Sequence, residues 1–154
     1  MFGWLKRKAS EADRMGRLPT WYAAMDGRTD ELRTALQSGL DVNHADENGL
    51  TMLGVAANYG RDDVIRLLLE NGADPNLTDG HGNGPLWAAT REATQVNHPE
   101  GPPATANTVR LLLEGGADPN HPNKGGRTPA GWAALVPELQ DVYRAAGYDG
   151  IFEL

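Results

Sequence analysis

The stretch Leu67-Leu-Leu-Glu-Asn-Gly-Ala-Asp-Pro-Asn76 decides the fold, because it returns as Leu111-Leu-Leu-Glu-Gly-Gly-Ala-Asp-Pro-Asn120. A run of leucines followed by glycine is typical of a helix that ends in a left-handed residue. The Ala-Asp-Pro-Asn segment then favours a turn. The recurrence therefore predicts a chain built from copies of one helix-and-turn unit.

The copies follow a period of about 33 residues that is interrupted once. Two sets of residues keep this spacing: Gly16, Gly49 and Gly82, and Ala23, Ala56 and Ala89. After Ala89 the register resumes at Ala133, a step of one period plus an insertion of about 11 residues. The insertion, at about 94–107, is rich in proline and glycine and is predicted to be a loop. A loop that carries function and a tolerated insertion both fit it.

Each unit predicts two helices. Thr51 can accept a hydrogen bond from the first turn of a helix that contains Ala56, and Gly60 ends that helix. The apolar residues of 64–69 then predict a second helix, which Gly72 closes in the left-handed conformation.

These residues resemble the ankyrin-repeat family, in particular Gly49-Leu-Thr-Met-Leu53, the two leucine stretches and Gly126-Arg-Thr-Pro129. The resemblance spans about residues 16–147. It implies an all-α solenoid of four helix pairs with projecting hairpin-like loops, and repeats at about 16–48, 49–81, 82–125 and 126–154. Residues 1–15 are expected to form a basic leader.

The first and last repeats depart from the family pattern and are predicted to be caps, since terminal repeats face water on one side. The family's usual histidine in the first helix of each repeat is also absent. The matching positions hold Trp21, Gly54, Trp87 and Gly131. We expect each indole to be a core residue that fills the space left by a neighbouring glycine.

The chain carries a net charge of −7, and its charges are unevenly distributed. After Arg17 there are 9 basic and 19 acidic side chains, a net charge of −10. Such a surface repels nucleic-acid phosphates and favours a partner protein with a basic face. The absence of cysteine suits a cytoplasmic location. The basic leader can either rest on an anionic membrane or fold back over the first repeat, and we expect the second.

Candidate chemistry is sparse, so we expect no enzyme, no cofactor and no metal. The four histidines, His44, His81, His98 and His121, do not pair at helical spacing. With no cysteine, Ser10 and Ser38 are the only candidates for a serine or cysteine nucleophile, and neither lies in a catalytic pattern.

The family resemblance implies a concave face, formed by the first helices and the loops, that binds proteins. By register we assign nine residues of the helices to this face: Tyr22, Met25, Val55, Asn58, Tyr59, Ala88, Arg91, Glu92 and Trp132. Tyr22, Tyr59, Arg91 and Trp132 are the expected anchors, because aromatic residues and arginine dominate binding energy at interfaces. Asp46, Glu47 and Asp79 are the loop acids expected to be available to a partner.

The sequence therefore predicts a protein-protein interaction module. The chain is similar to bacterial standalone ankyrin proteins, some of which are immunity proteins, so the leading hypothesis is an inhibitor that neutralises a toxin. The alternatives are an adaptor that bridges two partners and, more remotely, a small hydrolase.

Overall fold

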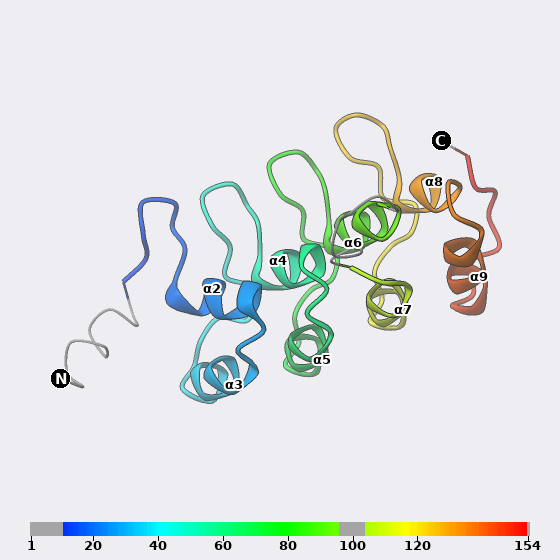
Figure 1. Cartoon of the computed structure of the whole chain (residues 1–154). Coiled ribbons are helices and arrows are strands. Elements are labelled where there is room, and N and C mark those ends of the chain that lie inside the picture. The colour runs from blue at the N-terminus through cyan, green and yellow to red at the C-terminus, as the bar shows by residue number, and fades with distance from the viewer. Residues whose placement is uncertain (1–10, 96–103, 154) are drawn as a thin grey trace.

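The computed structural model describes residues 11–95 and 104–153, which form eight helices and no strand. The helices are α2 (Pro19–Asp26), α3 (Thr29–Gln37), α4 (Met52–Asn58), α5 (Asp62–Glu70), α6 (Pro85–Ala93), α7 (Ala106–Glu114), α8 (Pro129–Ala133) and α9 (Pro137–Ala145). They follow one another as four pairs (Figure 1). The predicted solenoid of four helix pairs is confirmed.

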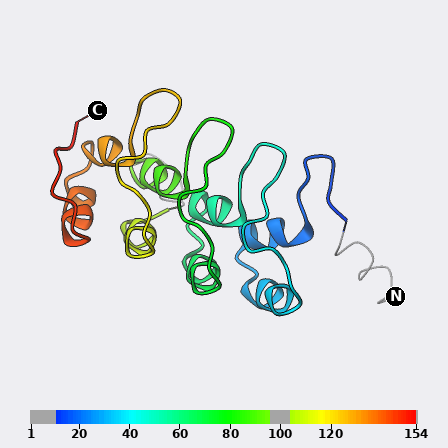
Figure 2. The same ribbon diagram turned by 180° about the vertical axis from the view of Figure 1, so that it is seen from behind.

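The pairs stack side by side in a row. The first helices, α2, α4, α6 and α8, form an inner layer in which each packs against the next. The second helices, α3, α5, α7 and α9, form an outer layer in the same order. Figure 2 shows the same two layers from behind.

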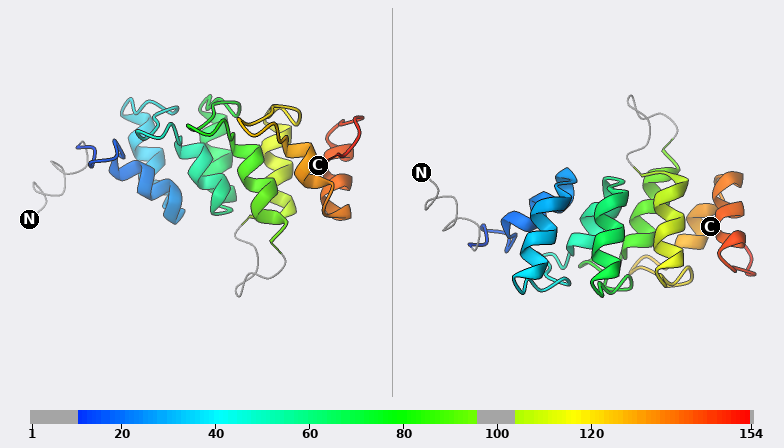
Figure 3. Two further views of the ribbon diagram at one scale, coloured as in Figure 1. Left: turned by 90° about the horizontal axis from the view of Figure 1, so that it is seen from above. Right: turned by 90° about the horizontal axis from the view of Figure 1, so that it is seen from below.

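Four loops project from the row on one side, and we call them finger loops one to four. Their residues are 11–18, 38–51, 71–84 and 115–128. Each loop precedes an inner helix and rises beside it (Figure 1). Viewed from above, the loops run along one end of the inner helices (Figure 3).

The predicted helix signals operate as expected. Thr51 accepts a hydrogen bond from Gly54 N at 3.0 Å and so caps α4. Gly60 follows the end of α4, and Gly72 follows the end of α5 with a φ of +85°. That φ belongs to the left-handed region, which only glycine enters without strain.

The core lies between the two layers and is continuous along the row. The fully buried side chains include Leu32, Leu68, Leu112 and Leu139, one from each outer helix. Alanines at the matching positions of the inner helices let the layers approach closely. Ala23, Ala56, Ala89 and Ala133 all have no exposed surface.

The predicted pairing of indoles with neighbouring glycines is wrong. A Cβ placed on Gly54 would meet Leu50 Cδ1 at 2.7 Å, and one on Gly131 would meet the Glu153 carbonyl oxygen at 2.6 Å. An aliphatic side chain and the C-terminal backbone therefore fill these spaces. Of the two tryptophans at this position, Trp21 is buried as predicted, whereas Trp87 is only half-buried.

None of the helices in 11–95 and 104–153 is long and apolar enough to cross a lipid bilayer.

Candidate functional site

The finger loops all turn in the same way. In each, one side-chain oxygen accepts hydrogen bonds from the backbone N–H groups two and four residues later. The residues that provide this oxygen are Asp13, Asp46, Asp79 and Asn123. They recur in the register of the repeat, with a longer step between the last two because the insertion lies there. The turn also occurs at Asp13, within the segment expected to be a leader.

Neighbouring finger loops are joined by backbone hydrogen bonds. Glu47 N donates to Met15 O, Gly80 N to Asn48 O, and Lys124 N to His81 O, at 2.8, 2.7 and 3.0 Å. The approach favours glycine at position 82, because Gly82 has a φ of +79° and a Cβ there would lie 3.0 Å from Lys124 N. The loops are therefore held in fixed positions beside the inner helices.

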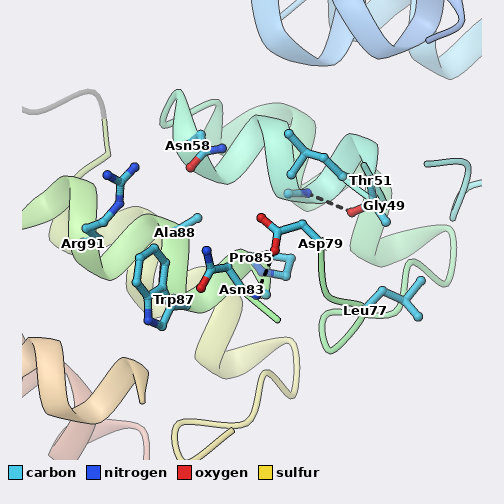
Figure 4. A pocket seen from close by; sticks show the side chains of 13 residues that line it. Gly49, Thr51, Asn58, Leu77, Asp79, Asn83, Pro85, Trp87, Ala88 and Arg91 are labelled. Carbon is cyan, nitrogen blue, oxygen red and sulfur yellow. Dashed lines mark hydrogen bonds between the residues drawn. The ribbon is translucent and has the colours of Figure 1, made fainter. Parts of the chain in front are cut away.

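A cleft of about 230 Å³ opens between α4, α6 and the third finger loop (Figure 4). Its lining combines apolar and polar groups. The residues are Gly49, Leu50, Thr51, Gly54, Asn58, Leu77, Asp79, Asn83, Gly84, Pro85, Trp87, Ala88 and Arg91. More of the lining surface is polar than apolar, so the cleft offers hydrogen-bonding groups beside a small apolar surface.

Asp79 lies in the middle of the cleft wall (Figure 4). Its Oδ1 accepts from His81 N at 2.8 Å and from Asn83 N at 3.0 Å. Within the described residues its Oδ2 has no hydrogen-bond partner. A fixed carboxylate with one available oxygen therefore faces the cleft.

Arg91 and Trp87 form the end of the cleft that lies on α6. The Arg91 guanidinium pairs with Glu92, and its Cζ lies 5.5 Å from the centre of the Trp87 ring. Trp87 in turn packs edge-to-face against Trp132, with ring centroids 6.0 Å apart. This cluster joins the third repeat to the fourth.

Four of the residues predicted for the face and its loops line this cleft: Asn58, Asp79, Ala88 and Arg91. Tyr59, at the end of α4, is 45% exposed and does not line the cleft. Glu92 is largely covered and accepts from both Arg91 and Gln95. Tyr22 and Met25 are half-buried on α2, where the Tyr22 hydroxyl donates to Asp13 Oδ2 at 2.5 Å.

The prediction that Asp46 is available to a partner is wrong. Its side chain has no exposed surface, and its Oδ2 accepts from Arg17 Nε at 3.1 Å. Arg17 and the turn backbone therefore occupy both carboxylate oxygens. Glu47, the next residue, remains exposed.

Val55 is also wrongly assigned to an open face, because it is only 1% exposed. Ala88 is 7% exposed and lines the cleft. Trp132 is half-buried, and its edge-to-face contact with Trp87 makes it part of the scaffold as well as of the surface.

The repeat register did not predict four further residues of the cleft lining: Leu50, Leu77, Asn83 and Trp87. Trp87 was assigned to the core because large apolar residues are usually buried. A usable signal was present, since the same repeat position holds Gly54 one period earlier, so this position does not require a large core side chain.

Two predictions fall mainly outside the described residues. Residues 1–10 of the predicted leader at 1–15 and residues 96–103 of the predicted insertion loop at 94–107 are not described. Within the described ranges, no three His, Cys, Asp or Glu side chains gather to hold a metal ion. His44 instead contacts Gly16 O through Nε2 at 2.9 Å.

Comparisons with known proteins add to this geometry. A family model described as ankyrin repeats, in three copies, matches residues 3–79, and one described as an ankyrin repeat matches residues 81–124. The first match alone covers half of the chain. No curated protein sequence matches the chain.

Proposed function

The chain belongs to the ankyrin-repeat family, whose repeats form protein-protein interaction modules, and we propose that it inhibits a partner protein that it binds through the cleft face. We define the cleft face as the cleft together with the exposed Tyr59 and Glu47. The proposed partner is a toxin, which makes this chain its cytoplasmic immunity protein.

The proposal rests on the cleft. The walls of the cleft are rigid, because the finger loops are joined by backbone hydrogen bonds and the inner helices pack on one another. A preformed site loses little conformational entropy when it binds, so more of the contact energy appears as affinity. Tight binding is what an inhibitor requires.

The charge supports a basic partner. The part of the chain after Arg17 carries a net charge of −10, and Asp79 and Glu47 lie on the cleft face. Opposite charges on the partner would speed association through electrostatic steering. Many enzymes that act on nucleic acids have basic active-site faces, and an acidic inhibitor could cover such a face.

The test is a capture experiment with matched baits. Wild-type protein, Tyr59→Ala and Arg66→Ala are immobilised and exposed to native cytoplasm, and bound proteins are quantified by mass spectrometry. Arg66 is exposed on the outer helix α5, so its truncation changes the opposite surface. A partner held by the cleft face is enriched on wild type and Arg66→Ala and reduced on Tyr59→Ala.

The second step separates inhibition from bridging. Purified partner is assayed for its own activity or toxicity with increasing amounts of this chain. Inhibition predicts that activity falls to a low level at a one-to-one ratio. A partner that binds and keeps full activity would make the chain an adaptor, and a partner captured equally by all three baits would exclude the cleft face.

A further inference from the structure

An arginine and a tryptophan cover the recurring turn aspartate one repeat before the cleft. Arg17 Nε donates to Asp46 Oδ2 at 3.1 Å, and Arg17 Cζ lies 4.4 Å from the centre of the Trp21 ring. The indole is held in place by a hydrogen bond from Nε1 to Leu50 O at 3.0 Å. Together these side chains bury the Asp46 carboxylate completely.

The next repeat has the same turn carboxylate but lacks the arginine and the tryptophan that cover it. Asp79 stands at the position of Asp46, whereas Leu50 and Gly54 stand at the positions of Arg17 and Trp21. Leucine carries no charge, and glycine has no side chain. The Leu50 side chain packs over Gly54, and Leu50, Gly54 and Asp79 all line the cleft. Asp79 therefore faces open space where Asp46 faces the arginine.

In the other turns, the second polar atom of the Asp or Asn side chain forms a hydrogen bond with another residue of the chain. Asp13 Oδ2 accepts from Tyr22, and Asn123 Nδ2 donates to Asn83 Oδ1 at 2.9 Å. Among the four turns in the described residues, Asp79 is the one whose second atom has no such partner. The difference is specific to the turn that faces the cleft.

We propose that the cleft binds an arginine side chain of the partner protein, in the place that Arg17 takes one repeat earlier. The inference rests on the proposed protein-binding function and identifies the group that the partner inserts. A guanidinium can pair with a carboxylate and lie flat against aromatic and aliphatic surfaces, and it is desolvated more easily than an ammonium group. Asp79 Oδ2 provides the charge, and Trp87 and Leu50 provide the surfaces.

Arg91 does not fill this place. Its guanidinium is paired with Glu92 and lies over the Trp87 ring. Figure 4 shows Arg91 at one end of the cleft, with Asp79 near its middle. The negative charge of Asp79 is therefore left for an incoming cation.

The probe that tests the proposal is Nα-acetyl-arginine N-methylamide, a blocked arginine without a terminal charge. It is titrated into the isotopically labelled full chain while backbone and indole N–H resonances are followed by NMR. We expect saturable shifts at Asp79, Asn83 and the Trp87 indole. The citrulline analogue, which has nearly the same shape and no charge, is expected to cause no saturable shift.

Three variants of the cleft are informative. Asp79→Asn keeps the turn, because Asn123 forms the same turn in the fourth loop, and it should weaken the probe about tenfold or more. Leu50→Arg should supply the missing guanidinium from within the chain and exclude the probe, since a tethered group acts at high effective concentration. Leu50→Gln, which is uncharged, should still bind the probe.

Glu70→Gln is the control for net charge, because it removes one exposed negative charge on the outer helix α5, away from the cleft face. It should bind the probe as wild type does. Equal binding of the arginine and citrulline probes, or unchanged binding by Asp79→Asn, overturns the proposal. The probe needs no partner protein, so its failure would exclude the arginine site alone, whereas equal capture by all three baits would exclude the proposed binding face.

Discussion

The hydroxyl groups of Thr90 and Tyr143 form a 2.6 Å hydrogen bond in the core, although 53 residues separate them in the chain. Thr90 lies on α6 and Tyr143 on α9, and neither has exposed surface. This bond ties the last repeat to its neighbour, and it satisfies two polar groups that water cannot reach.

Removing both hydroxyls should cost clearly less than the sum of the costs of removing each one alone. Tyr143→Phe leaves the Thr90 hydroxyl buried without this partner, which should lower the free energy of unfolding by about 1–3 kcal/mol. Thr90→Val should leave the Tyr143 hydroxyl buried without this partner and lower the free energy of unfolding by a similar amount. Urea unfolding of the double variant should show a loss clearly below the sum of the two single losses. Additive losses would mean that the two hydroxyls do not interact.

The same tyrosine should make the fold sensitive to alkali. Burial raises the pKa of Tyr143 above its ordinary value, and the hydrogen bond with Thr90 offsets this only in part. The stability linked to the neutral phenol is fully present below the unfolded pKa of about 10 and is lost as the pH rises above it. Urea unfolding at about pH 8 and about pH 11 should show a smaller pH-dependent loss for Tyr143→Phe than for wild type. Equal losses would contradict this.

Leu68 should be among the most sensitive core positions. It is fully buried in α5, and Leu68→Ala should lower the free energy of unfolding by about 2–5 kcal/mol because it leaves a cavity. Leu135 is 48% exposed, so Leu135→Ala serves as the matched control and should cost less than about 1 kcal/mol. Chemical denaturation measures both, and similar values would place Leu68 outside the core.

The Arg17–Asp46 pair should contribute more stability than the exposed ion pairs. Arg17→Ala leaves the fully buried Asp46 carboxylate without its cation, so it should lower the free energy of unfolding more than the loss of an exposed pair does. Arg28 pairs with Asp26 and Glu31 at the surface, so Arg28→Ala should cost less than about 1 kcal/mol. Thermal and urea unfolding compare the two, and a larger loss for Arg28→Ala would contradict the ranking.

Charge and aromatic contacts should affect different steps of partner binding. Glu47→Gln should slow association with the captured partner and weaken its dependence on salt, because an exposed charge steers encounter. Tyr59→Ala should instead speed dissociation and cost about 2 kcal/mol or more if the ring is a hot spot. Surface plasmon resonance separates the two rates.

Thermal unfolding of both variants provides the control for these rates. Each residue is exposed, so both variants should unfold at the wild-type temperature. Unchanged dissociation of a normally folded Tyr59→Ala would remove this ring from the interface.

The sequence by itself determined the repeat, the four helix pairs and the caps of the helices. These features depend on local patterns, such as the leucine runs, Thr51 before α4 and Gly72 after α5, that act within a few residues. The register also predicted Asn58 and Arg91 on the inner helices and Asp79 in a loop, and all three line the cleft. The other residues of the cleft lining did not follow from periodicity alone.

Only the tertiary structure decided which residues at the same repeat position are accessible to a partner. Asp46 and Asp79 occupy the same position of successive turns, but a side chain from the preceding repeat buries the first and leaves the second facing a cleft. Arg17 covers Asp46 from the preceding finger loop, and Leu50, which has no charge to offer, stands in the same relation to Asp79. Exposure at each turn therefore depends on a contact between repeats, which no pattern within a single repeat contains.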